Sequence, residues 1–156
     1  MKNKFINART CVYNCNYHIA WTTKRLQKVV SPEIESRMRE IILWTADNCG
    51  FVVHSIEIGG EGYVRLSVSA HPKMSVSYIV RALKSSTGQL LFKEFPSLKS
   101  KLYDGHLWDM SYFSETLGQA SEIAFRAYIK EQNKELGDGR KHKKHKASRK
   151  TEQGKN

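Results

Sequence analysis

The stretch FVVHSIEIGGEGYVRLSVSA, residues 51–70, decides the fold expected for this chain. Its two apolar segments, 51–58 and 63–70, flank the turn sequence GGEG, which predicts a hairpin of antiparallel strands. In the second segment, apolar residues alternate cleanly with Tyr63, Arg65 and two serines. We therefore expect a sheet with one buried face and one open face, with Tyr63 and Arg65 on the open face.

Helices and further strands are expected both before and after this hairpin in the sequence. Residues 9–21 and 106–116 are rich in aromatic and β-branched residues and predict two more strands. Capping and stop signals predict three helices, from Ser31-Pro32-Glu33 to Gly50, from Ser75 to about Pro96, and from Ser121 to about Leu136. The resulting order predicts an α+β fold, an antiparallel sheet with helices on one face.

The chain has a formal net charge of +11 over 156 residues, a length that excludes a multidomain enzyme. Residues 137–156 hold eight Lys or Arg and two Asp or Glu, a net +6, so residues 1–136 hold the other +5. We expect residues 1–136 to form one domain and residues 137–156 to form a disordered basic tail. Because the domain is basic in its own right, the expected partner is a polyanion, most simply a nucleic acid.

No apolar run is long enough for a transmembrane helix, and no export signal follows the first residues. A cytoplasmic protein without a membrane partner is therefore expected. The three cysteines are an odd number, which suits a reducing compartment better than a disulfide framework. Cys11 and Cys15 lie near His18, but no fourth ligand stands at a zinc-binding spacing.

Tyr128 and Gln132 are four residues apart in the last expected helix, so they share one face of it. A tyrosine hydroxyl can attack a phosphodiester when a metal polarises the phosphate, and a glutamine oxygen at this spacing can bind the same metal. A tyrosine on an amphipathic helix also serves as a core or interface residue, and the spacing alone does not separate these roles.

Several short motifs occur in an order that is typical of one family. They are NYHIAWTTKR at 16–25, the strand at 63–70, PKMSVS at 72–77, LKSS at 83–86, LW at 107–108, SYF at 111–113, TLG at 116–118 and YIKEQ at 128–132. Through these motifs, residues 9–134 resemble the single-tyrosine HUH transposases of small bacterial insertion sequences, the TnpA-like proteins.

The resemblance implies an RRM-like fold that forms a homodimer by pairing sheets and binds single-stranded or hairpin DNA. It implies that Tyr128 is the nucleophile, which forms a 5′-phosphotyrosine link, and that Gln132 is a ligand of Mg²⁺ or Mn²⁺. In the family, the other metal ligands are two histidines of a His-hydrophobic-His motif on a central strand.

That histidine motif is absent, because the matching positions read Tyr63-Val64-Arg65, preceded by Gly62 where the family usually has an acid. A guanidinium cannot bind a divalent cation at neutral pH, and a neutral phenol is a poor ligand. We therefore expect that the metal is not bound and that strand cleavage is lost. Two explanations of Arg65 stay open: it holds a DNA phosphate in place of the metal, or the site has simply decayed.

The other histidines do not replace the missing pair. Alternation with Val52, Ile56 and Ile58 predicts that His54 is buried in the core. His71 restores at most one ligand, and His18 has no partner at a ligand spacing.

Basic and aromatic side chains are the candidate nucleic-acid contacts. The basic candidates are Lys24, Arg25, Lys28, Arg65, Lys84, Arg126 and Lys130 in the domain, with Lys141, Lys143 and Lys144 in the tail. Candidates for stacking on unpaired bases are Tyr17, Tyr63 and Tyr112. Three functions remain open: a transposase-family protein that binds hairpin DNA without cleaving it, an active transposase with an unorthodox metal site, and a repurposed RNA-binding or regulatory module.

Overall fold

The computed structural model describes residues 6–116 and residues 130 and 131. Residues 1–121 and residues 122–156 form two compact units, and the fold below is that of the first. Lys130 and Glu131 of the second unit are helical. The catalytic candidates Tyr128 and Gln132, the predicted boundary at residue 136 and the basic tail all lie outside the described residues.

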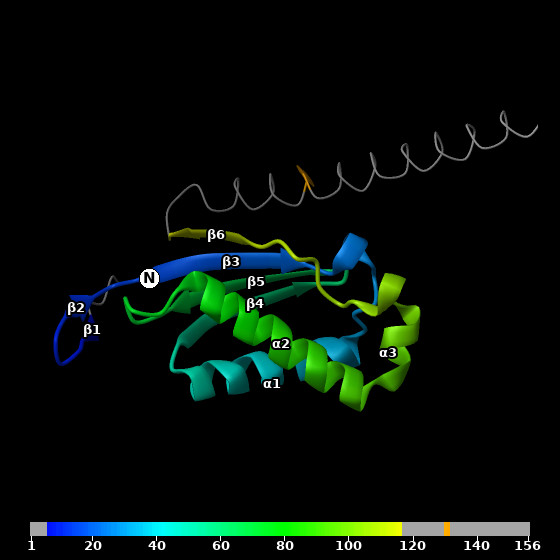
Figure 1. Cartoon of the computed structure of the whole chain (residues 1–156), viewed down its shortest axis with the longest axis horizontal. Helices are drawn as coiled ribbons and strands as arrows, with labels where there is room; N and C mark the ends of the chain where they lie inside the picture. Colours follow the sequence, from blue (N-terminus) through cyan, green and yellow to red (C-terminus); the bar gives the residue numbers. More distant parts are fainter. Residues whose placement is uncertain (1–5, 117–129, 132–156) are drawn as a thin grey trace, which may run out of the picture. The chain divides into compact units, whose positions relative to one another are not determined.

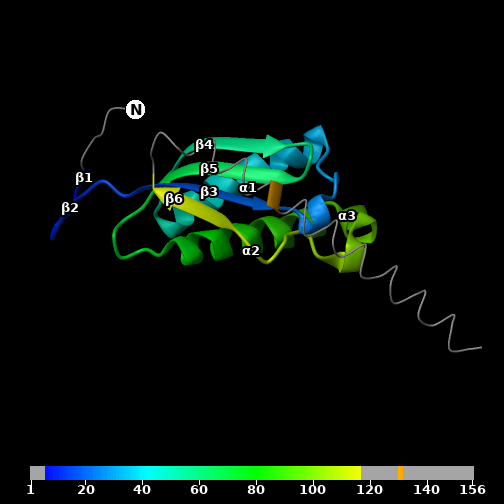
Figure 2. The ribbon, with the colours of Figure 1, turned by 90° about the horizontal axis from the view of Figure 1, so that it is seen from above.

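A four-stranded sheet forms the centre of the first unit. Its strands lie in the order β4-β5-β3-β6, and each neighbouring pair is antiparallel, as the view from above shows (Figure 2). The strands are β3 (Asn16–Thr22), β4 (Val52–Gly59), β5 (Tyr63–Ser69) and β6 (Phe113–Thr116). Two long helices, α1 (Pro32–Cys49) and α2 (Val76–Glu94), cover one face (Figure 1). This arrangement confirms the predicted α+β fold.

Shorter elements complete the unit. Two small strands, β1 (Ile6–Asn7) and β2 (Val12–Tyr13), pair only with each other. Helix α3 (Pro96–Lys101) follows α2, and the 3-10 turns η1 (Lys24–Leu26) and η2 (Tyr103–Gly105) lie after β3 and α3. Among the described residues, no helix is both long enough and apolar enough to cross a membrane.

The core lies between the sheet and the two long helices. In the register of the central strands, Ile19 stands opposite Leu66 and Trp21 opposite Val64, and all four side chains are buried. They pack into one cluster with Met38, Ile41 and Ile42 of α1 and Ile79, Leu83 and Leu91 of α2.

The face of the sheet away from this cluster, which we call the open face, carries Tyr63 and Arg65, both half-buried. The expectation that this face is open along the whole strand is wrong at Ser67 and Ser69, which are buried. The Ser69 hydroxyl forms hydrogen bonds with the side chains of His54 and Asn16.

The helix caps and the helix stop that the sequence predicts are present in the structure. The Ser31 hydroxyl accepts a hydrogen bond from the Ile34 amide at 3.3 Å, and Gly50 ends α1 with a φ of +83°. The Ser75 hydroxyl accepts one from the Tyr78 amide at 3.1 Å. Each cap satisfies a backbone N–H that has no partner inside the helix.

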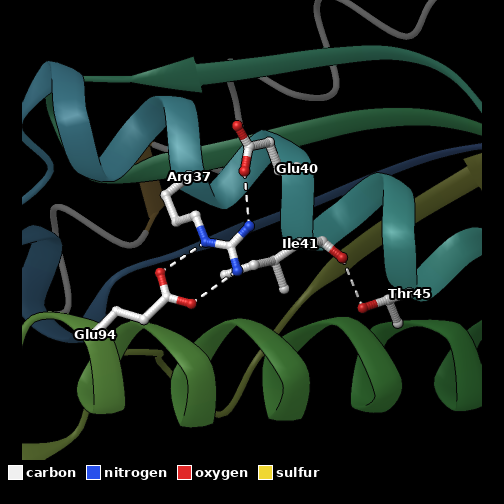
Figure 3. Close-up of polar contacts among 5 residues, drawn as sticks. All are labelled: Arg37, Glu40, Ile41, Thr45 and Glu94. Atoms are coloured by element: carbon white, nitrogen blue, oxygen red, sulfur yellow. Dashed lines mark hydrogen bonds and ion pairs between the residues drawn. The ribbon is translucent and has the colours of Figure 1, made fainter.

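A bidentate ion pair joins α1 to α2 on the helical side of the unit (Figure 3). The Arg37 guanidinium donates to both carboxylate oxygens of Glu94, each at 2.7 Å, and also to Glu40 at 2.7 Å. Two carboxylates thus neutralise this cation, so it is a structural contact between helices and is less available to a phosphate than an unpaired arginine.

Two predicted strands are shorter than expected. The strand predicted over 9–21 divides into β2 and β3, and the strand predicted over 106–116 is regular only at β6. In the second case, the Asp109 carboxylate accepts hydrogen bonds from the amide of Ser111 at 3.1 Å and from its hydroxyl at 2.5 Å. Such local side-chain bonds fold the backbone into a turn, which competes with strand pairing.

The prediction that His54 is buried is wrong. The pairing of β4 with β5 shifts register between Val53 and Ser55, so one extra residue interrupts the alternation. Val53 consequently packs against the core, whereas Val52 and His54 are exposed. The His54 imidazole instead forms a hydrogen bond with the Ser69 hydroxyl.

Candidate nucleic-acid interface

Tyr63 and Arg65 form a cluster with Glu57 on the open face. Glu57 stands opposite Arg65 in the register of β4 and β5. The Tyr63 hydroxyl donates to one Glu57 oxygen at 2.7 Å, and an Arg65 nitrogen lies 3.6 Å from the other. The hydrogen bond to Glu57, together with burial, raises the pKa of Tyr63 to about 12, so its phenol is neutral at physiological pH.

This Tyr63-Glu57-Arg65 cluster does not fit a divalent cation. The Glu57 carboxylate is the one good oxygen ligand in it, and it already binds the phenol and the guanidinium. A cation placed beside Glu57 would also meet the positive charge of Arg65. Within the part of the chain that the structure describes, no three His, Cys, Asp or Glu residues come together as a metal site.

Gly62, the other departure from the family pattern, has a structural reason. Its φ is +95°, a conformation that side-chain-bearing residues rarely adopt. Its amide donates to the Gly59 carbonyl at 2.9 Å, and its own carbonyl accepts from the Thr23 amide at 2.7 Å. A side chain at this position would collide with the Thr23 hydroxyl, so the turn before Tyr63 excludes an acid.

The structure brings together a histidine–glutamate pair that the sequence reading missed. His18 of β3 stands opposite Glu115 of β6 on the open face, with 3.7 Å between Nδ1 and Oε1. Both atoms are buried without a hydrogen-bond partner among the described residues. Glu115 lies far along the chain from His18, so only the pairing of β3 with β6 makes them neighbours.

Three predicted phosphate contacts lie at or near η1. The Lys24 ammonium forms an ion pair with Asp104 at 3.1 Å, and the Arg25 guanidinium stacks over the Tyr103 ring at 3.5 Å. Arg25 and Lys28 are exposed, whereas Lys24 is half-buried. Arg25 and Lys28 are therefore better placed to reach a ligand, and Lys24 ties η1 to η2.

Lys84 has a structural role that the sequence did not reveal. Its ammonium donates to the carbonyls of Asp109 and Ser111, at 2.7 and 2.8 Å. Burial lowers the pKa of Lys84 to about 8. The side chain therefore holds the segment 109–112 against α2 and is less free to contact a phosphate than an exposed lysine.

The replacement Lys84→Met is expected to destabilise the unit by about 1–2 kcal/mol, because two half-buried carbonyls lose a charged donor. Urea unfolding followed by circular dichroism measures the loss. Lys93→Met, at an exposed position in the last turn of the same helix, is the matched control and should leave the midpoint unchanged. Equal midpoints for wild type and Lys84→Met would contradict the anchoring role.

The lowered pKa of Lys84 also predicts how the difference in free energy of unfolding between wild type and Lys84→Met changes with pH. Between about pH 8 and the ordinary lysine value of 10.5, the unfolded chain binds more protons at Lys84 than the folded chain. The free energy of unfolding of the wild type, relative to Lys84→Met, should therefore rise with pH across this window.

The other predicted nucleic-acid contacts differ in how exposed their side chains are. Tyr17 packs against the core, and burial is the first cause that raises its pKa, so it is not a stacking platform. Tyr112 is 38% exposed and remains a candidate. Lys130 is exposed in its helix. Four predicted contacts lie outside the described residues: Arg126, Lys141, Lys143 and Lys144.

Comparisons with known proteins agree with the fold and with the motif order. Residues 11–132 match the family model described as "Transposase IS200 like". The ISDra2 transposase TnpA of Deinococcus radiodurans is 30% identical over 125 residues, which cover 80% of this chain and 89% of that protein. The transposase for insertion sequence element IS200 of Salmonella typhimurium is 26% identical over 133 residues, covering 79% and 80%.

Two solved structures are similar in fold. A crystal structure of a candidate transposase from Deinococcus radiodurans superposes with a TM-score of 0.77 at 29% identity, covering 81% of this chain and 97% of that one. A REP-associated tyrosine transposase bound to a REP hairpin has a TM-score of 0.50 at 8% identity, covering 72% and 61%, and shares the fold alone. From the family match over most of its length and the ISDra2 relative, we conclude that this chain belongs to the IS200-like transposase family.

Proposed function

We propose that this protein binds single-stranded or hairpin DNA but no longer cleaves it by the metal-dependent tyrosine chemistry of its family. The observation that carries the proposal is the Tyr63-Glu57-Arg65 cluster, which stands where the resemblance places the two histidine ligands. A guanidinium there supplies a fixed positive charge suited to a phosphate, without the Lewis acidity of a metal.

The electrostatics of the open face support DNA binding through Arg65. Its side chain is 22% exposed, so it keeps contact with solvent, and the Glu57 partner is 52% exposed. The pair is long, with 3.6 Å between nitrogen and oxygen, and water reaches the exposed Glu57 carboxylate and screens it. A phosphate can therefore compete with Glu57 for the guanidinium. The hairpin-bound REP transposase illustrates a nucleic acid held on the same fold.

The test is incubation with labelled single-stranded hairpin DNA and Mg²⁺ or Mn²⁺, followed by denaturing electrophoresis. We expect hairpin binding with no covalent protein–DNA adduct. Because no metal is required in this proposal, excess EDTA should leave the affinity unchanged. A strong metal-dependent adduct that disappears in Tyr128→Phe would overturn the proposal and establish an active transposase with an unorthodox site.

Further experiments distinguish this proposal from the alternative functions. The double variant Tyr63→His/Arg65→His asks whether the missing ligands alone restore cleavage; an adduct in this variant would show that Tyr128 and Gln132 are competent and that the strand positions are the defect. Tighter binding to folded RNA than to any DNA hairpin would instead favour an RNA-binding module. Sedimentation with and without DNA tests the homodimer that the family leads us to propose.

A further inference from the structure

A cavity of about 400 Å³ lies between α1 and α2 on the helical side of the unit, which Figure 3 shows in part. This volume is within the range of small-ligand sites, about 300–1,000 Å³, so it can admit large side chains of a docked peptide. None of the functions discussed above uses this cavity, which we call the helical groove. Its lining residues are Arg37, Glu40, Ile41 and Trp44 of α1 and Leu90 of α2.

The groove contains an exposed indole. Trp44 is 59% exposed, whereas Trp21 is completely buried and Trp108 is half-buried. Beside Trp44, the buried Ile41 and the half-buried Leu90 supply further apolar surface. Tryptophan is one of the side chains that most often dominate the binding energy of a protein interface. The groove therefore has the composition of an anchoring site for a partner.

An acidic stripe runs through Trp44 along α1. Glu33, Glu40 and Asp47 follow one another at intervals of seven residues, nearly two turns of helix, and all three are exposed. Trp44 lies four residues after Glu40 and three before Asp47, so a carboxylate stands on each side of the indole along the helix. Among the described residues, neither Glu33 nor Asp47 forms an ion pair.

The positive charges near this stripe are already neutralised. Arg37 is held by two carboxylates, as described above, and the Arg39 guanidinium donates to Glu35 at 2.8 Å. On α2, the exposed neighbours Lys93 and Glu94 have opposite charges. Helix α1 as a whole holds four Asp or Glu and two Arg, a net −2 in a chain of +11. The charge of this surface therefore favours a cationic partner over a nucleic acid.

An indole flanked by carboxylates is suited to bind an organic cation. The face of a tryptophan ring attracts a guanidinium or an ammonium more strongly than the faces of other aromatic rings do. The carboxylates of Glu40 and Asp47 can accept charge-assisted hydrogen bonds from the same group. The aliphatic stem of an arginine or lysine packs well on apolar surface, which Leu90 supplies here.

We propose that the helical groove docks a basic amphipathic segment of a partner protein, with an arginine or lysine over Trp44 and an apolar side chain against Ile41 and Leu90. Residues 137–156 of a second copy fit less well, because they supply positive charge but no apolar side chain larger than alanine. The inference does not depend on the proposed hairpin binding, since it uses the helical side and not the open face.

The experiment measures the binding of three labelled synthetic peptides to the full-length protein by fluorescence anisotropy. The first peptide is a helix with leucines on one face and arginines beside them. The second replaces every arginine with glutamate, and the third replaces every leucine with serine. We expect the first to bind, the second not to bind, and the third to bind about tenfold more weakly. The affinity of the first should fall with rising salt, because salt screens exposed carboxylates.

Three variants locate the binding site. Trp44→Leu keeps an apolar side chain and removes the ring face, so it should weaken binding of the first peptide about threefold to thirtyfold. Asp47→Asn should weaken it a few-fold. Leu43→Ala is the control, because Leu43 is a neighbour on α1 that is 51% exposed and does not line the cavity; it should bind as the wild type does. Circular dichroism checks that each variant is folded.

Four results would overturn the inference. They are failure of the first peptide to bind at about 1 mM, equal affinities for the first and second peptides, equal affinities of wild type and Trp44→Leu, and tighter binding of a peptide of residues 137–156 than of the first peptide. The last result would assign the groove to a second copy of this chain. Hairpin affinity should be unchanged in Trp44→Leu, so failure of the wild type to bind hairpins overturns the proposed function and leaves this inference standing.

Discussion

Replacing Arg65 with alanine is expected to weaken hairpin binding about tenfold to a hundredfold, because hydrogen bonds to charged groups contribute about 1.5–3 kcal/mol. The loss of one phosphate contact should also reduce the slope of log affinity against log salt concentration by about one. Filter binding or anisotropy at several salt concentrations measures both quantities. If neither changes, the Arg65–phosphate contact is refuted and decay of an unused site remains as the explanation.

The Glu57 carboxylate provides a second test, because removing its charge should strengthen hairpin binding, whereas removing Arg65 should weaken it. Glu57→Gln keeps the shape of the side chain and removes the charge that competes for the guanidinium, so hairpin affinity should rise a few-fold. Arg37→Ala is the matched control. Its guanidinium is engaged by two carboxylates on the helical side, and its loss should leave the affinity and the salt slope unchanged (Figure 3).

The second large effect concerns Trp21, the completely buried indole of β3. Trp21→Ala is expected to lower the free energy of unfolding by about 3–5 kcal/mol, the usual cost of removing a large aromatic from a core. The indole packs edge-on against Trp108, with 5.9 Å between ring centroids and an interplanar angle of 89°. Urea unfolding followed by circular dichroism gives the difference directly.

Trp21→Phe is the informative companion of this variant. The Trp21 indole N–H is buried and has no hydrogen-bond partner among the described residues, whereas that of Trp108 donates to the Thr87 hydroxyl at 2.9 Å. Phenylalanine keeps a ring and removes an unpaired donor whose desolvation penalises the folded state. We expect it to cost less than half as much as alanine. Equal costs for the two variants would contradict the view that the unpaired indole N–H penalises the folded state.

The elements that the sequence predicted well are those with local signals. The caps at Ser31 and Ser75 and the stop at Gly50 each depend on residues a few positions apart, and all are present in the structure. The alternation of β5 is present from Tyr63 to Leu66 and ends where Ser67 and Ser69 are buried. The failures arose where a distant or irregular feature intervened. The shift in register beside Val53 turned His54 outward, and the turn at Asp109 shortened the last strand.

The same division applies to the candidate site. The sequence by itself determined that the chain is basic, that Tyr63 and Arg65 share the open face, and that no imidazole stands at either position, because charge and period-two alternation are properties of the chain alone. Only the tertiary structure decided which residues those side chains contact. The register of β4 and β5 places Glu57 beside Arg65, and the pairing of β3 with β6 places His18 beside Glu115. The packing of α2 lets Lys84 form hydrogen bonds with the carbonyls of residues 109 and 111. Such contacts join residues far apart in the chain, and their geometry follows from register and packing, which no local spacing encodes.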